Sequence, residues 1–147
     1  MRILSLSSLL FMLLIVITSC NFGPSDPVTI EDAWIREAPP NATAMAGYML
    51  ITNHTENNII LQSATSPAFK TIEFHRSVEK DGVYRMIPQL HLHIDANSSF
   101  ELKPGDFHLM LFNPVKRLVE GDNAVITLNF SDEQTVVTTV PVKKAQF

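Results

Sequence analysis

The chain has 147 residues, 46% of them hydrophobic, and a formal net charge of −4 at pH 7. This length suits one packed domain and is short for two. The acidic balance argues against nucleic acid as a partner, because proteins that bind phosphate backbones gather Lys and Arg on their surface.

Residues 1–19 have the features of a secretory signal peptide. Arg2 supplies the positive start, and an apolar stretch at 3–17 follows it. A transmembrane anchor is the competing interpretation, but a helix that spans a bilayer needs roughly 20 apolar residues. Ile17, the last residue of this stretch, begins the sequence Ile-Thr-Ser-Cys at 17–20, which resembles the bacterial lipobox. We therefore expect a lipoprotein whose signal peptide is removed before Cys20.

Cys20 is the only cysteine in the chain. If it carries lipid, the folded domain has no thiol for a disulfide, a nucleophile or a metal ligand. A spare thiol is the alternative, but an unpaired thiol is unusual in an oxidising compartment. Asn21 resembles the pattern that lets a lipoprotein move on to an outer membrane. We expect residues 20–27 to be a lipidated N-terminus and tether, facing the periplasm and anchored in the outer rather than the inner membrane.

Residues 28–147 are expected to form one all-β domain. Short apolar stretches follow one another, separated by turn-forming residues such as Lys-Pro-Gly-Asp at 103–106. No stretch of ten or more residues keeps the 3.6-residue period of a helix. Many short strands at this spacing are typical of an antiparallel sandwich or barrel. The expected strands are 28–35, 45–52, 59–65, 71–78, 83–87, 90–94, 99–103, 107–112, 124–130 and 135–142.

The expected strand at 107–112 carries a histidine and a methionine on one face. His108 and Met110 are two residues apart, and side chains alternate along a strand, so Leu109 points to the other face. Each residue type has an ordinary use in a protein core. The pair alone therefore does not define a site.

A second pair, His75 and Met86, lies at the two ends of an expected hairpin. A four-residue loop at 79–82 would place them directly opposite each other. A two-residue turn at Asp81 and Gly82 would place them diagonally on one face. A three-residue loop without a bulge would put them on opposite faces, so the sequence leaves the register open.

The spacing of the two pairs resembles a known family. His75 is followed by ten residues and Met86, and then by twenty-one residues and His108-Leu109-Met110. This pattern is similar to that of the periplasmic copper chaperones of the PCuAC family. The resemblance extends through 32–53, 101–112 and 118–130. Many members have a methionine directly after the first histidine, where this chain has Arg76.

The resemblance implies a cupredoxin-like, immunoglobulin-like antiparallel β-sandwich that holds Cu(I). It also implies delivery of copper to the binuclear centre of cytochrome c oxidase subunit II, in cooperation with a Sco-type thiol protein. The implied ligands are His75, Met86, His108 and Met110. Thioether sulfur is a soft donor that favours Cu(I), and imidazole suits copper, so these residue types match the implied ion. A partner must reach the methionines, so we expect the site near a sheet edge.

His91 and His93 form a competing, auxiliary metal site. They share a strand face, which is an arrangement that can chelate Cu(II) or zinc, and His54 is a possible third donor. Solvent-facing histidines between buried aliphatic residues would explain the same spacing without a metal.

Other functional classes fit less well. An electron-transfer cupredoxin needs a cysteine ligand in its folded domain. No motif such as Gly-x-Ser-x-Gly joins a nucleophile to a base, so we expect no enzymatic activity. The remaining alternative is a metal-free envelope lipoprotein that serves as an interaction module.

Several aromatic and thioether side chains are expected to pack the core or its edge. This expectation covers the aromatic residues Trp34, Tyr48 and Tyr84 and the methionines Met45 and Met49.

Overall fold

The structure is a computed structural model that describes residues 26–144 of the chain. The expected signal peptide, Cys20 and residues 20–25 of the tether lie outside these residues. Within 26–144, no helix has the length and apolar character that a bilayer crossing requires.

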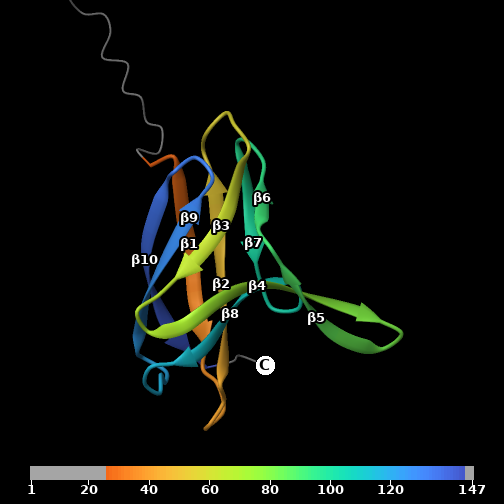
Figure 1. The fold of residues 1–147 in the computed structure, drawn as a ribbon, viewed down its shortest axis with the longest axis vertical. Coiled ribbons are helices and arrows are strands. Elements are labelled where there is room, and N and C mark those ends of the chain that lie inside the picture. The colour runs from red at the N-terminus through yellow and green to blue at the C-terminus, as the bar shows by residue number, and fades with distance from the viewer. Residues whose placement is uncertain (1–25, 145–147) are drawn as a thin grey trace, which may run out of the picture.

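The described residues form ten strands (Figure 1). All ten strands expected from the sequence are present, and no strand end differs from its expected position by more than two residues. The strands are β1 (Val28–Arg36), β2 (Ala44–Asn53), β3 (Ile59–Thr65), β4 (Phe69–Lys80), β5 (Val83–Gln89), β6 (Leu92–Ile94), β7 (Ser98–Leu102), β8 (Phe107–Pro114), β9 (Asn123–Phe130) and β10 (Thr135–Lys143).

The strands pair in the order β5-β4-β8-β2-β1-β10-β9-β3-β6, and β7 pairs with β2. The path turns over between β1 and β10, which gives the two layers of a sandwich (Figure 1). One layer contains β5, β4, β8, β2, β1 and β7, and the other contains β10, β9, β3 and β6. The all-β sandwich expected from the sequence is confirmed.

One strand pairing departs from the expected antiparallel arrangement. β1 and β10 run parallel, with Ile35 opposite Val142 and Arg36 opposite Lys143. These are the first and last strands, and no hairpin turn joins them, so nothing local requires them to run in opposite directions. The sheet is therefore mixed, although its other pairings are antiparallel.

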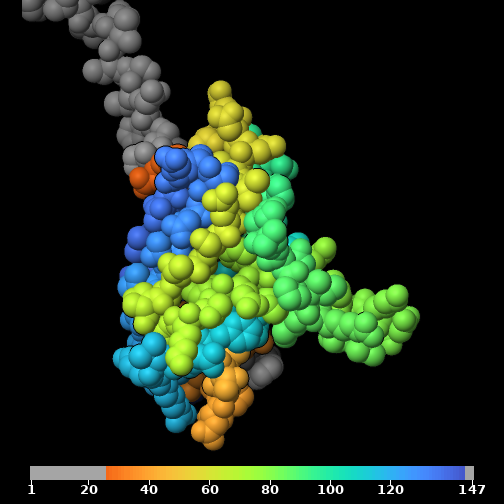
Figure 2. Space-filling view, in the orientation of Figure 1, coloured from red at the N-terminus to blue at the C-terminus, as the bar shows by residue number. Residues whose placement is uncertain are grey.

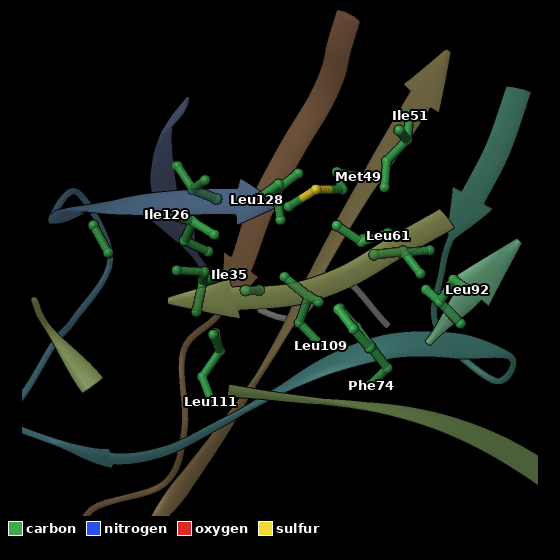
Figure 3. Packing of buried hydrophobic residues seen from close by; sticks show 14 of the residues in the cluster. Ile35, Met49, Ile51, Leu61, Phe74, Leu92, Leu109, Leu111, Ile126 and Leu128 are labelled. Atoms are coloured by element: carbon green, nitrogen blue, oxygen red, sulfur yellow. The ribbon is translucent and has the colours of Figure 1, made fainter. Parts of the chain in front are cut away.

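The hydrophobic core lies between the two layers. Leu109 and Phe74 of one layer point toward Leu61 and Leu128 of the other, and all four side chains are buried (Figure 3). Met45 and Met49 also belong to this cluster, which confirms that they are packing residues.

Gly47 allows β2 and β8 to approach each other in the core. A Cβ atom at this position would lie 3.3 Å from Leu111 Cδ1 and 3.4 Å from Leu109 Cβ. Any larger residue would push against these two leucines, which are both fully buried. The glycine therefore leaves room for these buried leucines of β8, the strand that carries His108 and Met110.

A bulge in β1 decides which of its side chains face away from the core. The register against β2 shifts between Glu31 and Trp34, and Asp32 has a positive φ of 50°. The extra residue reverses the alternation of side chains, so both Ile30 and Ile35 face the core although they are an odd number of residues apart. Trp34 consequently shares the outer face with its partner Tyr48.

Candidate metal centre

The two histidines of the motif lie side by side on adjacent strands. His75 on β4 is the cross-strand partner of His108 on β8, and their ring centroids are 6.1 Å apart. The neighbouring residues Phe74 and Leu109 face the core, so both imidazoles lie on the outer face of this layer. They are nevertheless buried, with exposed fractions of 9% for His75 and 3% for His108.

The hydrogen bond of His108 leaves one of its ring nitrogens free. Its Nδ1 lies 2.9 Å from the backbone oxygen of Asp106. A carbonyl oxygen only accepts hydrogen bonds, so Nδ1 carries the proton and donates it. In the neutral imidazole, Nε2 then carries no proton, and its lone pair is available to a metal ion.

His75 uses the other ring nitrogen, Nε2, for its hydrogen bond. Its Nε2 lies 2.9 Å from Oε2 of Glu73, and an ionised carboxylate only accepts, so Nε2–H is the donor. In the neutral imidazole, Nδ1 is then an acceptor without a proton. It is buried and has no hydrogen-bond partner among the residues that the structure describes. A buried acceptor without a partner is costly, and a bound metal ion would remove that cost.

Met110 lies on the same outer face as the two histidines. It is the cross-strand partner of Glu73, two residues beyond His108 on β8. Its side chain is half-buried. The His108 imidazole and the Met110 thioether are therefore neighbours along one face of β8.

Met86 reaches this face through the turn of the β4–β5 hairpin. Of the three loop lengths that the sequence allows, the two-residue turn is present, with Lys80 opposite Val83. Asp81 and Gly82 have φ angles of 57° and 76°, as a type I′ turn requires. His75 is then opposite Pro88, and Met86 is diagonal to His75 on the same face.

The four residues implied by the motif thus lie on one face of three neighbouring strands at the edge of the sheet. They differ in accessibility. Both histidines are buried and Met110 is half-buried, whereas Met86 is 60% exposed.

Two aromatic rings and one guanidinium lie next to one another on the β2 side of His108. Tyr48 lies with its ring centroid 6.5 Å from that of His108, and Trp34 lies 4.6 Å from Tyr48. The Arg36 guanidinium sits over the Tyr48 ring at 5.3 Å. Burial raises the pKa of the Tyr48 phenol, an effect that the nearby Arg36 opposes, so the phenol stays neutral and offers no anionic ligand.

Of the aromatic residues expected to pack, Tyr48 is buried and Trp34 packs against its ring on the outer face, whereas the expectation is wrong for Tyr84. Tyr84 is 72% exposed, near the tip of the β4–β5 hairpin. The hairpin tip has no neighbouring strand to cover it, because β8 pairs with β4 only as far as Arg76.

Sequence reasoning missed Glu73 and the grouping of the two rings with the guanidinium. Glu73 stands two residues before His75 and therefore on the same strand face, which is a signal that could have been used. Arg36 could not have been found in this way, since only the bulge in β1 turns it to the outer face.

The competing pair His91 and His93 does not gain His54 as a third metal donor. His91 and His93 are exposed, with ring centroids 5.1 Å apart. His54 is instead engaged by Thr29, whose Oγ1 lies 2.9 Å from its Nε2. Across residues 26–144, no group of three or more His, Cys, Asp or Glu side chains is placed to hold a metal ion.

The fold and this cluster define a small β-sandwich with two imidazoles and two thioethers on one outer face. Residues 28–142 match the family model described as "Putative lipoprotein LpqE-like". The chain belongs to this LpqE-like family. It is 33% identical over 120 residues to "Putative lipoprotein Lxx21020" of Leifsonia xyli subsp. xyli (strain CTCB07). The aligned residues cover 81% of this chain and 71% of that protein.

Solved structures show the same sandwich. The copper-bound PCuAC domain from PmoF2 superposes with a TM-score of 0.70 at 22% identity, over 82% of this chain and 95% of that domain. The solution structure of CuI-DR1885 from Deinococcus radiodurans has a TM-score of 0.62 at 28% identity, over 81% and 80% of the two chains. The resemblance to PCuAC domains seen in the sequence is therefore confirmed.

Proposed function

We propose that this protein is a copper(I) chaperone of the bacterial cell envelope. It holds Cu(I) through His75, Met86, His108 and Met110 and passes the ion to the binuclear copper centre of cytochrome c oxidase subunit II. The observation that carries this proposal is the buried and unpartnered Nδ1 of His75, beside His108 and on the same face as two thioethers.

The ligand chemistry favours Cu(I) over harder ions. Two thioethers and two imidazoles are neutral and soft to intermediate donors, which suits Cu(I) better than zinc or magnesium. Thiolates would bind Cu(I) more tightly but can be oxidised to disulfides outside the cytoplasm. The folded domain offers thioethers in their place, since Cys20 is the only cysteine of the chain.

Two similar structures support copper as the cargo. One is named as a copper-bound PCuAC domain and the other as CuI-DR1885. We propose the same ion for this chain, carried and released rather than used in catalysis. We further propose that a Sco-type thiol protein takes part in the assembly of the oxidase centre.

The envelope location rests on the N-terminal sequence and on a relative's name. The lipobox-like Ile-Thr-Ser-Cys at 17–20 follows an apolar stretch, and the Leifsonia relative is named as a lipoprotein. We propose that Cys20 is lipidated and that the domain faces the periplasm from the outer membrane. Labelling cells with a fatty-acid analogue tests this: the wild type should be tagged, and Cys20→Ser should not.

Direct copper binding is the decisive test of the proposed function. Purified protein is titrated with Cu(I) under anaerobic conditions, and X-ray absorption reports the neighbours of the metal. We expect one tightly bound Cu(I) with sulfur and nitrogen neighbours. Absence of Cu(I) binding would contradict the proposal and favour the metal-free interaction module.

A further inference from the structure

The tip of the β4–β5 hairpin stands away from the rest of the domain. Past Arg76, β4 no longer pairs with β8, and β5 is the last strand of the sheet. We name residues 77–86 the arm. It extends clear of the body in the ribbon and in the space-filling view, where it is the green projection (Figures 1 and 2).

The arm exposes large apolar side chains that a monomer gains nothing by exposing. Tyr84 is 72% exposed, Met86 60% and Val83 52%. Contiguous exposed apolar groups on a soluble domain commonly mark a site of interaction. The free edge of β5 adds backbone groups to which no strand of residues 26–144 is paired.

Successive side chains of β5 alternate between the two faces of the arm. Tyr84 and Met86 alternate onto the face that carries His75 at the root of the hairpin. Val83 and Arg85 point to the opposite face. The aromatic ring of Tyr84 is therefore next along the strand from the exposed thioether.

The accessibility of the ligands determines where an exchange partner must approach. This argument rests on the proposed function. His75 and His108 are buried and Met110 is half-buried, so an incoming donor meets Met86 first. The donor's lone pair forms a bond to copper while the bond between copper and the Met86 sulfur breaks. The metal stays Cu(I), so no electron changes hands.

We propose that the face of the arm formed by Tyr84 and Met86 is the docking surface for the protein that receives the copper. That partner carries a soft sulfur or nitrogen donor close to its own surface. Exposed tyrosines are frequent anchors of protein interfaces because they bury a large area and lose few rotamers.

Two other occupants fit the arm less well. A second copy of this chain would offer an identical set of side chains, so copper would gain no tighter site by moving to it. An anionic lipid surface attracts clusters of positive charge. The arm instead balances Lys80 and Arg85 against Glu79 and Asp81, all of them exposed.

The test compares two faces of one strand and two kinds of acceptor. Wild type, Tyr84→Ser and Val83→Ser are loaded with Cu(I) and mixed either with the soluble copper-centre domain of oxidase subunit II or with bicinchoninate. The chelator needs no protein surface. We expect Tyr84→Ser to slow transfer to the protein domain by about tenfold and to leave transfer to the chelator and Cu(I) affinity unchanged. Val83→Ser, on the opposite face, should match the wild type in all three measurements.

The outcomes separate this inference from the proposed function. If the wild type does not bind Cu(I), the proposed function fails. If the wild type binds Cu(I) but passes none to the oxidase domain, or if Tyr84→Ser transfers at the wild-type rate, the docking surface is refuted and copper binding stands. Equal slowing in Tyr84→Ser and Val83→Ser would also refute it. So would self-association, or binding to anionic vesicles, that Tyr84→Ser abolishes.

Discussion

Two adjacent residue pairs of β4 and β8 are both buried, although they lie on opposite faces of the sheet and differ in chemistry. On the inner face, Phe74 and Leu109 are cross-strand partners in the core. On the outer face, the next pair along is His75 and His108, and these side chains are buried to a similar degree. The difference lies in their polar atoms, because one buried imidazole nitrogen is left without a hydrogen bond. Burial alone does not separate a core from a binding site, and a buried polar atom without a partner is a feature of the outer pair that the inner pair lacks.

The largest expected effect comes from disrupting the inner face. Leu109→Ala removes a fully buried side chain between the two layers and should lower the free energy of unfolding by about 2–5 kcal/mol. Urea denaturation followed by circular dichroism measures this loss. Where the variant is folded, Cu(I) affinity should remain close to that of the wild type, since Leu109 points away from the site. A loss under about 1 kcal/mol would contradict the assignment of Leu109 to the core.

Removing both thioethers should greatly weaken Cu(I) binding on the outer face and leave the packing of the inner face intact. Met86→Leu with Met110→Leu keeps size and apolar character, so the free energy of unfolding should change by under about 1.5 kcal/mol. Cu(I) affinity should fall by more than about 100-fold, because a lost ligand costs more than a lost supporting group. The remaining imidazoles should shift the metal preference toward Cu(II) and zinc. Competition against a Cu(I)-specific chelator measures the affinity, and a folded double variant with wild-type affinity would make both methionines packing residues.

Glu73 should have an intermediate effect, since it orients the proposed ligand His75 and is not itself among the proposed ligands. Glu73→Ala removes the acceptor of the His75 Nε2–H and should weaken Cu(I) binding by about 10–100-fold. Glu73→Gln keeps an amide oxygen as acceptor and should restore much of the affinity. Nitrogen-15 NMR of the imidazole should show the Nε2–H tautomer of His75 in the wild type and a mixture in Glu73→Ala.

Glu79→Ala is the matched control for Glu73. Glu79 is also an exposed acid on β4, on the same strand face but out on the arm. Its removal changes the net charge equally and should leave both Cu(I) affinity and the His75 tautomer unchanged. Equal losses in the two alanine variants would mean that general electrostatics, and not the hydrogen bond, support the site.

The smallest effect is expected on the other layer of the sandwich. His91→Gln with His93→Gln alters the exposed pair around β6 and should change Cu(I) affinity by less than about twofold, because two imidazoles without a soft donor are a poor match for Cu(I). Equilibrium competition with the same chelator measures it. A large drop would show that the pair belongs to the Cu(I) site.

The sequence predicts most of the fold because each strand carries its own pattern. Alternating apolar residues and turn residues depend only on neighbours in the chain, which is why all ten strands could be located. The parallel pairing of β1 with β10 could not be predicted in this way, since it joins two segments that no turn connects. The bulge at Asp32 was hidden for a similar reason, because it is visible only against the register of β2.

The sequence also indicates which residue types gather at the site but not how they are held. The intervals between His75, Met86, His108 and Met110 are readable directly. The register of the hairpin, the bond from His75 to Glu73 and the exposure of Tyr84 depend on which strand lies beside which. That information arises only when β4 is placed between β5 and β8.

The left-handed conformation at Asp81 and Gly82 determines which side chains of β5 share a face with His75 and His108. β5 has a partner strand on one side only, so little besides the turn holds it in register. A slip by one residue would take the Met86 sulfur to the wrong side of the sheet and bring Arg85 or Ile87 into its place. Backbone handedness at the tip of the arm therefore decides whether a methionine sulfur or a side chain without sulfur shares the face of His75.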